Sequence, residues 1–302
     1  MTPTTARADH ATGATPLEIL VDLLDLEIIE VDIFRGKQPL EALQRVFGGQ
    51  VAGQALVAAG RTVSADRPVH SLHAYFLRAG DPSIPIVYEV DRIRDGRSFT
   101  TRRVVAIQHG KAIFHLSASF QVAETGLEHA IEMPEVPDPE TLPTLAERLR
   151  PYVKEPELQW ILRPRAIDIR YVGDPPRIAK QNGVREPTSR VWMRADGILP
   201  DDPLLHVCAA TFASDMTLLD STLAKHGRSW GPKDVVGASL DHAMWFHRPF
   251  RADEWFLYDQ ESPWTGGGRG LARGAIYTRD GQLAVSVVQE GLIRVPWTTP
   301  PA

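Results

Sequence analysis

An aspartate interrupts the apolar face of a predicted helix in the second half of this 302-residue sequence. Residues 202–226 have helical spacing, and Asp215 lies in the middle of an apolar stripe made of Leu205, Cys208, Phe212, Leu219 and Leu223. An ionised carboxylate on a core-facing stripe is unfavourable unless it is paired or hydrogen-bonded. Two explanations stay open: Ser214-Asp215 caps a second helix if the stretch breaks there, or Asp215 is a general base that holds a water molecule.

A glutamine occupies a similar position in the last predicted strand, residues 283–294. Alternation along this strand places Gln289 in a row with Leu283, Val285, Val287 and Ile293. A buried amide needs hydrogen-bond partners, which neighbouring backbone or a functional site could supply. Ser239 precedes Leu240-Asp241-His242 at the start of another strand, where a hydroxyl is ordinarily solvated or bonded to backbone.

Other reactive residue types give weaker signals. Cys208 shares the apolar stripe of the helix and is interpreted as a small core residue. His242 and His247 could act as acid or base, but a single histidine in a strand is more often structural. The sequence has no Gly-x-Ser-x-Gly elbow, no His-Glu-x-x-His and no cysteine pair, so no serine nucleophile, metal or cofactor is expected. The glycine-rich run 266–270 precedes a strand, which favours a hairpin turn or mobile loop over a phosphate-binding loop.

Charge and composition exclude several classes of protein. The 33 basic and 38 acidic residues give a formal net charge of −5 without any basic block, so nucleic acid is not an expected partner. No run approaches the roughly 20 apolar residues that span a bilayer. Residues 1–15 lack the apolar core of a secretory signal, and the one cysteine rules out an intramolecular disulfide. We therefore expect a soluble, cytoplasmic protein with no membrane insertion.

The elements that must position these side chains follow from hydrophobic periodicity. A helix is predicted over residues 16–31, and a Gly- and Ala-rich helix over 48–60 that another element approaches very closely. Asp95-Gly96 and His109-Gly110 are expected at tight turns. Strands are predicted at 70–77, 86–93, 98–109 and 112–122 in the first half, and at 166–172, 189–195, 238–246, 255–261, 270–277 and 283–294 in the second.

The two halves resemble each other in pattern. His73-Ala74 followed by Phe76 and Arg78 matches His242-Ala243 followed by Phe246 and Arg248, and the turn His109-Gly110 matches Asp280-Gly281. A repeated unit of helix and antiparallel sheet is the simplest interpretation, and two unrelated α+β domains are the alternative. Seven prolines between residues 132 and 164 mark a linker with one short helix near 142–149. The predicted organisation is a disordered tail (1–15), a first domain (16–124), a linker (125–164) and a second domain (165–296).

Several of these segments together resemble the acyl-CoA thioesterase II family, and the resemblance extends from about Leu17 to Arg294. The run Leu240-Asp241-His242-Ala243-Met244-Trp245-Phe246-His247-Arg248-Pro249 is highly specific. Three shorter segments add to it: Arg45-Val46-Phe47-Gly48-Gly49-Gln50, Ala213-Ser214-Asp215 and Val288-Gln289-Glu290-Gly291. The resemblance implies an α+β fold of two fused hotdog domains, each an antiparallel sheet wrapped round a long helix.

It also implies a reaction, the hydrolysis of fatty acyl-CoA by direct attack of water. The residues corresponding to the family's water-activating groups are Asp215, Ser239 and Gln289. The family's usual residue at 239 is threonine; the hydroxyl remains, so we expect its role to remain, with a less fixed rotamer. Gly48 and Gly49 are suggested as oxyanion donors. Because Gln50 takes the place of Asp215 in the first half, one site per chain is expected.

Two alternatives to hydrolysis stay open. The hotdog scaffold also carries acyl-CoA hydratases and dehydratases that use an Asp-His pair, which Asp241-His242 could supply. The chain could instead be a non-catalytic acyl-CoA sensor. Assembly as a homo-oligomer, a dimer or a tetramer, is expected because hotdog sheets pair side by side.

Overall fold

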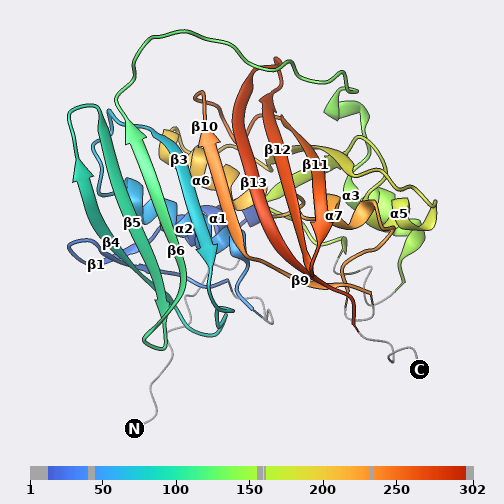
Figure 1. The fold of residues 1–302 in the computed structure, drawn as a ribbon, viewed down its shortest axis with the longest axis horizontal. Coiled ribbons are helices and arrows are strands. Elements are labelled where there is room, and N and C mark those ends of the chain that lie inside the picture. Colours follow the sequence, from blue (N-terminus) through green and yellow to red (C-terminus); the bar gives the residue numbers. More distant parts are fainter. Residues whose placement is uncertain (1–12, 40–44, 155–158, 160, 232–233, 297–302) are drawn as a thin grey trace.

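The described strands form one continuous antiparallel sheet. A computed structural model describes residues 13–39, 45–154, 159, 161–231 and 234–296; most of the predicted N-terminal tail lies outside these ranges. The strand order is β1-β2-β4-β5-β6-β3-β10-β13-β12-β11-β8-β7, with β9 paired to β13. In Figure 1 the sheet lies in front and the helices lie behind it.

The first half of the chain contributes two helices and six strands to the described structure. They are α1 (Pro16–Leu24), β1 (Glu27–Glu30), β2 (Ile33–Gly36), α2 (Gly48–Gly60), β3 (Val69–Phe76), β4 (Ile86–Asp95), β5 (Phe99–Gln108) and β6 (Lys111–Gln121). The described part of the connection to the second half holds three short helices, η1 (Pro139–Thr141), α3 (Leu145–Leu149) and η2 (Arg150–Tyr152).

The second half follows the same plan with extra helical pieces. Its described elements are β7 (Ile167–Tyr171), α5 (Pro176–Gln181), β8 (Thr188–Ala195), α6 (Pro203–Ser214), α7 (Asp220–Ala224), β9 (Val236–Ser239), β10 (Asp241–Phe246), β11 (Phe256–Gly266), β12 (Arg269–Thr278) and β13 (Leu283–Arg294). The predicted strands are thus present, with small differences at their ends, whereas β1, β2 and α5 were not predicted. The predicted strand 238–246 is split at Leu240 into β9 and β10.

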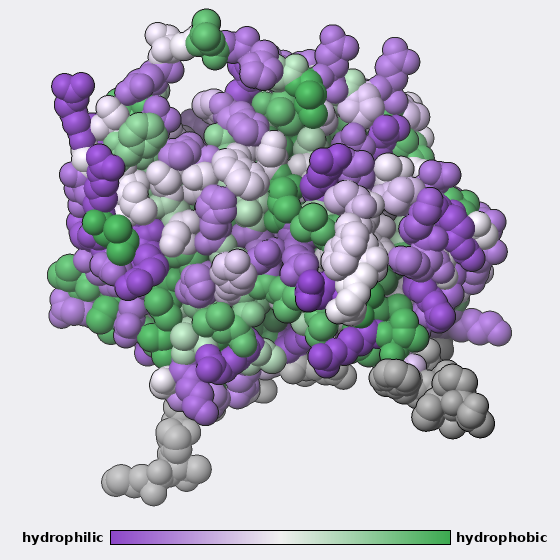
Figure 2. Space-filling model, in the orientation of Figure 1, coloured by the Kyte–Doolittle hydropathy of each residue, from purple (hydrophilic) through white to green (hydrophobic). Residues whose placement is uncertain are grey.

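The two halves meet where β3 pairs with β10, and the strand order runs outward from this pair in the same way on both sides. Ala74 lies opposite His242 in this pair, and both are buried. His73, in contrast, faces outward, so the predicted match of His73 to His242 is wrong by one position: residues one apart in a strand point to opposite faces. The outward face carries interspersed polar and apolar residues (Figure 2), which agrees with alternation in a sheet that is solvated on one side.

Helices α2 and α6 pack against each other behind the sheet, with very little space between their backbones. A Cβ on Gly53 would lie 3.2 Å from the carbonyl oxygen of Cys208, and Gly60 meets the side chain of Leu204. These contacts run in opposite directions along the two helices, so α2 and α6 are antiparallel. The predicted close approach to residues 48–60 is confirmed, and Cys208 is a fully buried free thiol, as expected of a core residue.

Two predicted helices are too long. The helix predicted over 16–31 ends at Leu24, and its continuation forms β1 at the edge of the sheet, where Ile28 is exposed. The helix predicted over 202–226 breaks after Ser214, where Ser214 Oγ lies 2.9 Å from the Thr211 carbonyl oxygen and Asp215 turns toward partners outside the helix. His206, which the helical wheel places away from the apolar stripe, is buried and accepts a hydrogen bond from the Ala252 backbone.

Short turns connect the long hairpins. His109 and Gly110 both have positive φ, the backbone that a two-residue hairpin turn requires. Gly267 and Gly268 do the same between β11 and β12, so the glycine-rich run is a hairpin turn. No helix in the described part of the chain is long and apolar enough to span a membrane.

The proline-rich connection is attached to the second half. It passes over one end of the sheet in Figure 1. Trp192 and Trp255 donate their indole N–H groups to the Pro137 carbonyl at 3.0 Å and to Glu140 Oε1 at 2.8 Å. The rings of these two tryptophans pack with Met133, Val136 and Leu142 of the connection. Residues 133–142 are therefore held on the sheet by specific contacts.

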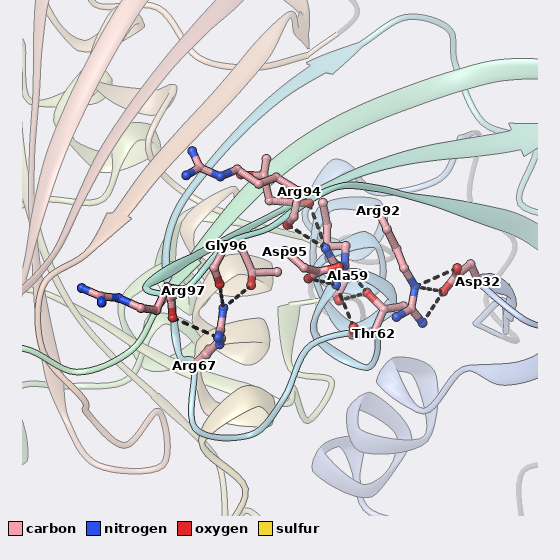
Figure 3. A network of polar contacts seen from close by, with 12 residues as sticks. Asp32, Ala59, Thr62, Arg67, Arg92, Arg94, Asp95, Gly96 and Arg97 are labelled. Atoms are coloured by element: carbon pink, nitrogen blue, oxygen red, sulfur yellow. Dashed lines mark hydrogen bonds and ion pairs between the residues drawn. The ribbon is translucent and has the colours of Figure 1, made fainter.

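Arg102 of β5 joins the β4–β5 hairpin to the end of α2. It is 1% exposed, and all five of its N–H donors are used. Two go to the hydroxyl and carbonyl of Thr62, two to backbone carbonyls of the hairpin, and one to Asp95 Oδ1 at 2.7 Å. Figure 3 shows Thr62, Arg94 and Asp95 gathered in this network. The guanidinium is shielded from water, and all of its donors are satisfied by these partners.

We expect Arg102→Met to lower the free energy of unfolding by about 3–5 kcal/mol, because the methionine leaves these carbonyls without donors. Denaturant titration measures the change. Arg103→Met is the matched control: Arg103 is the next residue, lies on the opposite face and makes only an exposed ion pair with Asp91, so its loss should cost less than about 1 kcal/mol. Equal losses in the two variants would contradict the prediction.

Candidate active site

Side chains from three elements meet at Asp215, the residue that ends α6. Its Oδ1 accepts a hydrogen bond from Gln289 Nε2 at 2.6 Å and another from Ser239 Oγ at 3.2 Å. Gln289 Nε2 also lies 3.0 Å from Ser239 Oγ, which completes a triangle of contacts. The structure thus brings together the three residues singled out in the sequence.

The pairing of β9 with β13 positions the hydroxyl and the amide. Ser239 lies opposite Gly291, two residues beyond Gln289, so both side chains project from the same face of the sheet. Gln289 is fully buried in the inward row of β13, as its alternation predicts. The backbone departs from regular pairing at Leu240, where β9 ends and β10 begins.

The first half of the chain closes the site with the N-terminus of α2. The Gly49 backbone N–H is hydrogen-bonded to the Asp215 carboxylate, and a Cβ on Gly48 would lie 2.6 Å from Asp215 Oδ2. Arg45, just before α2, donates to the Gly237 carbonyl on β9 at 2.7 Å. Both halves therefore contribute to one site.

The hydrogen bond from the Gly49 N–H to Asp215 shows which helix Asp215 caps. The short helix α7 begins at Asp220, and its N-cap residue Leu219 provides no side-chain cap, so Asp215 does not cap the helix that follows it. Instead it accepts from the first turn of α2, a helix from the other half. Gly49, suggested from the sequence as an oxyanion donor, uses its N–H on the aspartate.

The environment of Asp215 favours its protonated form more than water does. Burial raises the pKa of its carboxyl from 3.8 to about 6, although hydrogen bonds from Gln289, Ser239 and Gly49 and the charge of Arg45 oppose the rise. The residue as a whole is only partly exposed to solvent. A carboxylate with a pKa near 6 is ionised at neutral pH and still basic enough to accept a proton from water.

A second buried carboxylate lies five residues further on. Burial raises the pKa of Asp220 to about 6 as well, but its oxygens accept from Trp230 Nε1 at 2.6 Å and lie 3.5 Å from the Tyr171 hydroxyl. Its hydrogen-bond partners are different from those of Asp215. Asp220 therefore lies apart from the triangle of contacts.

The histidines divide between the two faces of the sheet. His247 is exposed on the outer face and contacts Ser286, on the opposite face of β13 from Gln289. His242 is 1% exposed, and its Nε2 lies 2.8 Å from Ser214 Oγ. Asp241 accepts from the Glu290 backbone N–H at 2.6 Å; as the neighbour of His242 in a strand it projects from the other face, so the two do not form an Asp-His pair.

Two site neighbours were missed in the sequence. Ser214 was considered only as a possible cap, and His242 only as an acid, a base or a structural residue. The inward alternation of His242, Met244 and Phe246 in the strand, set beside that of Gln289, was the available signal. Gln50, the first-half counterpart of Asp215, is buried and donates to Gln38 Oε1 at 3.1 Å. Within the described residues no group of three or more His, Cys, Asp or Glu is arranged to hold a metal ion.

The fold is that of a double hotdog protein, and comparisons with known proteins identify its family. The family model described as "Acyl-CoA thioesterase" matches residues 165–292, and that described as "Acyl-CoA thioesterase N-terminal domain" matches residues 37–121. The chain belongs to the acyl-CoA thioesterase II family.

Relatives match along most of their length. The chain is 44% identical to human acyl-coenzyme A thioesterase 8, over 92% of this chain and 89% of the relative. It is 39% identical to acyl-CoA thioesterase 2 of Haemophilus influenzae, over 92% and 98%. Among solved structures, an acyl-CoA thioesterase II, TesB2, from Mycobacterium marinum is 46% identical with a TM-score of 0.75, over 93% and 100%. A protein with a hot dog fold from Alicyclobacillus acidocaldarius, 20% identical with a TM-score of 0.74 over 92% and 98%, shares the fold.

Proposed function

We propose that this protein hydrolyses fatty acyl-CoA to free fatty acid and CoA, with water as the nucleophile. One observation carries the proposal: a desolvated but still accessible carboxylate, Asp215, is held by a hydroxyl and an amide that come from two neighbouring strands. Family membership supports the substrate class. No acyl-enzyme intermediate is needed.

Each residue has a distinct part in the reaction. Asp215 accepts a proton from the attacking water while Ser239 and Gln289 orient that water toward the thioester carbonyl carbon. The C–S bond breaks as the tetrahedral intermediate collapses, and the proton held by Asp215 passes to the departing CoA sulfur. The N-terminus of α2 carries partial positive charge and stabilises negative charge that develops beside it.

The proposal is tested by measuring free thiol released from a panel of acyl-CoA chain lengths. Saturable thiol release that depends on Asp215 supports hydrolysis. A changed double-bond absorbance without thiol release would indicate a hydratase, and saturable binding without either product would indicate a sensor. The chain length with the highest kcat/KM defines the preferred substrate.

The pH profile should report the ionisation of Asp215. Because burial raises its pKa to about 6, and the ionised form is the base, we expect kcat/KM to fall about tenfold per pH unit below pH 6 and to level off above it. Asp220 has a pKa in the same range, so Asp220→Asn is the control and should leave the midpoint unchanged. A flat profile from pH 5 to 8 would remove Asp215 as the base.

The organisation of the chain is proposed to follow its two halves: a tail (1–15), a first hotdog domain (16–124), a linker (125–164) and a second hotdog domain (165–296). We propose one active site per chain, since Gln50 stands where the second carboxylate would be. Cytoplasmic location is supported by the single, buried free thiol. We propose that the chain forms a homo-oligomer, a dimer or a tetramer, and light scattering measures its size.

A further inference from the structure

A buried histidine lies directly behind the proposed water-orienting amide. In the ladder between β10 and β13, Ala243 pairs with Val288, so His242 and Gln289 are opposite each other at the next position. Opposite residues of an antiparallel pair project from the same face with Cβ atoms roughly 5 Å apart. Both side chains are shielded from water, with exposed fractions of 1% and 0%.

The hydrogen bonds of Gln289 fix the orientation of its amide. Its Nε2 faces Asp215 Oδ1 and Ser239 Oγ, and an ionised carboxylate can only accept. The reversed amide would place two oxygens against each other. The oxygen Oε1 must therefore point away from Asp215, and it is buried without a hydrogen-bond partner in the described structure.

His242 has the complementary unpaired atom. Its Nδ1 is also buried without a partner, whereas its Nε2 lies 2.8 Å from Ser214 Oγ. Burial lowers the pKa of His242 to about 4, and the nearby Gln289 amide only partly opposes this shift, so at neutral pH the ring carries one proton. A proton on Nδ1 satisfies Gln289 Oε1 and leaves Nε2 as an acceptor. The single hydroxyl proton of Ser214 then points to Nε2 and not to the Thr211 carbonyl oxygen, which lies 2.9 Å from Ser214 Oγ. A proton on Nε2 leaves two buried acceptors facing each other, which is costly.

We propose that His242 is a positioning residue that donates from Nδ1–H to Gln289 Oε1, with its Nε2 turned to the Ser214 hydroxyl, and so keeps the Gln289 amide turned toward Asp215 and Ser239. The inference rests on the proposed role of Gln289 in the reaction. It extends the site inward to a second layer of polar residues, of which Ser214 comes from the same α6 terminus as Asp215. The orientation of the attacking water would thus depend on the Nδ1 proton of His242, which acts through the Gln289 amide.

The test compares two substitutions of the histidine. In His242→Asn the amide nitrogen can occupy the place of Nδ1 and donate, whereas His242→Leu provides no donor. We expect His242→Leu to lower kcat about tenfold to hundredfold, the scale seen for outer partners that orient functional groups, with KM changed less than about threefold. The pH midpoint of kcat/KM should rise, because a mobile Gln289 stabilises ionised Asp215 less. His242→Asn should retain kcat to within about fivefold.

Controls separate positioning from packing. Phe246→Leu changes another buried inward residue of β10, four positions from His242, and should leave kcat and the pH midpoint unchanged. Wild-type kcat and pH midpoint in a folded His242→Leu would overturn the proposal, as would a folded Asn variant that is as slow as the Leu variant.

A measurement on the substrate-free wild-type protein is independent of activity and of the folding of the variants. The ¹⁵N shifts of the His242 ring should show protonation at Nδ1 and not at Nε2. Protonation at Nε2 would overturn the proposal even if the enzyme hydrolyses acyl-CoA. The Nδ1–H tautomer in a protein that hydrolyses no thioester would instead refute only the proposed function.

Discussion

Asp215→Asn is expected to reduce kcat for acyl-CoA hydrolysis by a factor of about 10² to 10⁴, the usual contribution of a general base. Asparagine keeps the shape of the side chain and an oxygen that can accept from Gln289 and Ser239, but it cannot accept a proton from water. KM should change little. Thiol release under saturating substrate measures the loss.

The same substitution should not destabilise the fold. Because the folded-state pKa of Asp215 is raised from 3.8 to about 6, the folded state favours the protonated carboxyl, and the free energy of unfolding falls as the pH rises through this range. Above pH 6 the penalty is constant, of the order of 2–3 kcal/mol. Asparagine does not ionise, so the variant should melt at or above the wild-type temperature at pH 8, with a smaller difference at pH 4.

These two readouts separate catalysis from capping. If the variant is inactive and its melting temperature at pH 8 equals or exceeds that of the wild type, Asp215 is a catalytic base whose ionised form lowers the stability of the fold. A variant that melts well below wild type at pH 8 would mean that the contact with α2 is mainly structural. A fully active variant would exclude Asp215 from the mechanism.

Gly49→Ala is expected to lower the free energy of unfolding by about 3 kcal/mol or more. A Cβ at Gly49 would overlap the Phe212 carbonyl oxygen, which is backbone of α6 and cannot rotate aside, so α2 and α6 must separate. The same change in an exposed helix stabilises by about 0.5–1 kcal/mol, so any loss reports the collision. The melting temperature should fall by roughly 5–10 °C.

Activity should fall in Gly49→Ala as well, because Gly49 donates its N–H to Asp215 and α2 cannot shift without moving the site. Gly126→Ala is the control: a Cβ there meets nothing within 4 Å, and both stability and kcat should remain at wild-type values. If Gly49→Ala has the same melting temperature as the wild type, the close approach of α2 and α6 does not exclude a larger side chain at residue 49.

The pattern of the sequence was sufficient for the elements that bury one clear face. Strict alternation predicted β5, β6, β12 and β13, and the small residues of 48–60 predicted a closely packed helix. The same patterns singled out Asp215 and Gln289, because each is a polar residue in an otherwise apolar row. Short edge elements were missed: β1 is exposed along its whole length, so it has no buried face to leave a periodic signal.

The sequence by itself determined the family and the residue types that could activate water, since both depend on local runs of residues. Only the tertiary structure decided where α6 ends, which face of β10 carries His242, and that the N-terminus of α2 from the other half meets Asp215. The physical reason is that Asp215, Ser239, Gln289 and Gly49 lie far apart along the chain. Their contacts, and the desolvation that raises the pKa of Asp215, arise only when the two half-sheets join at β3 and β10.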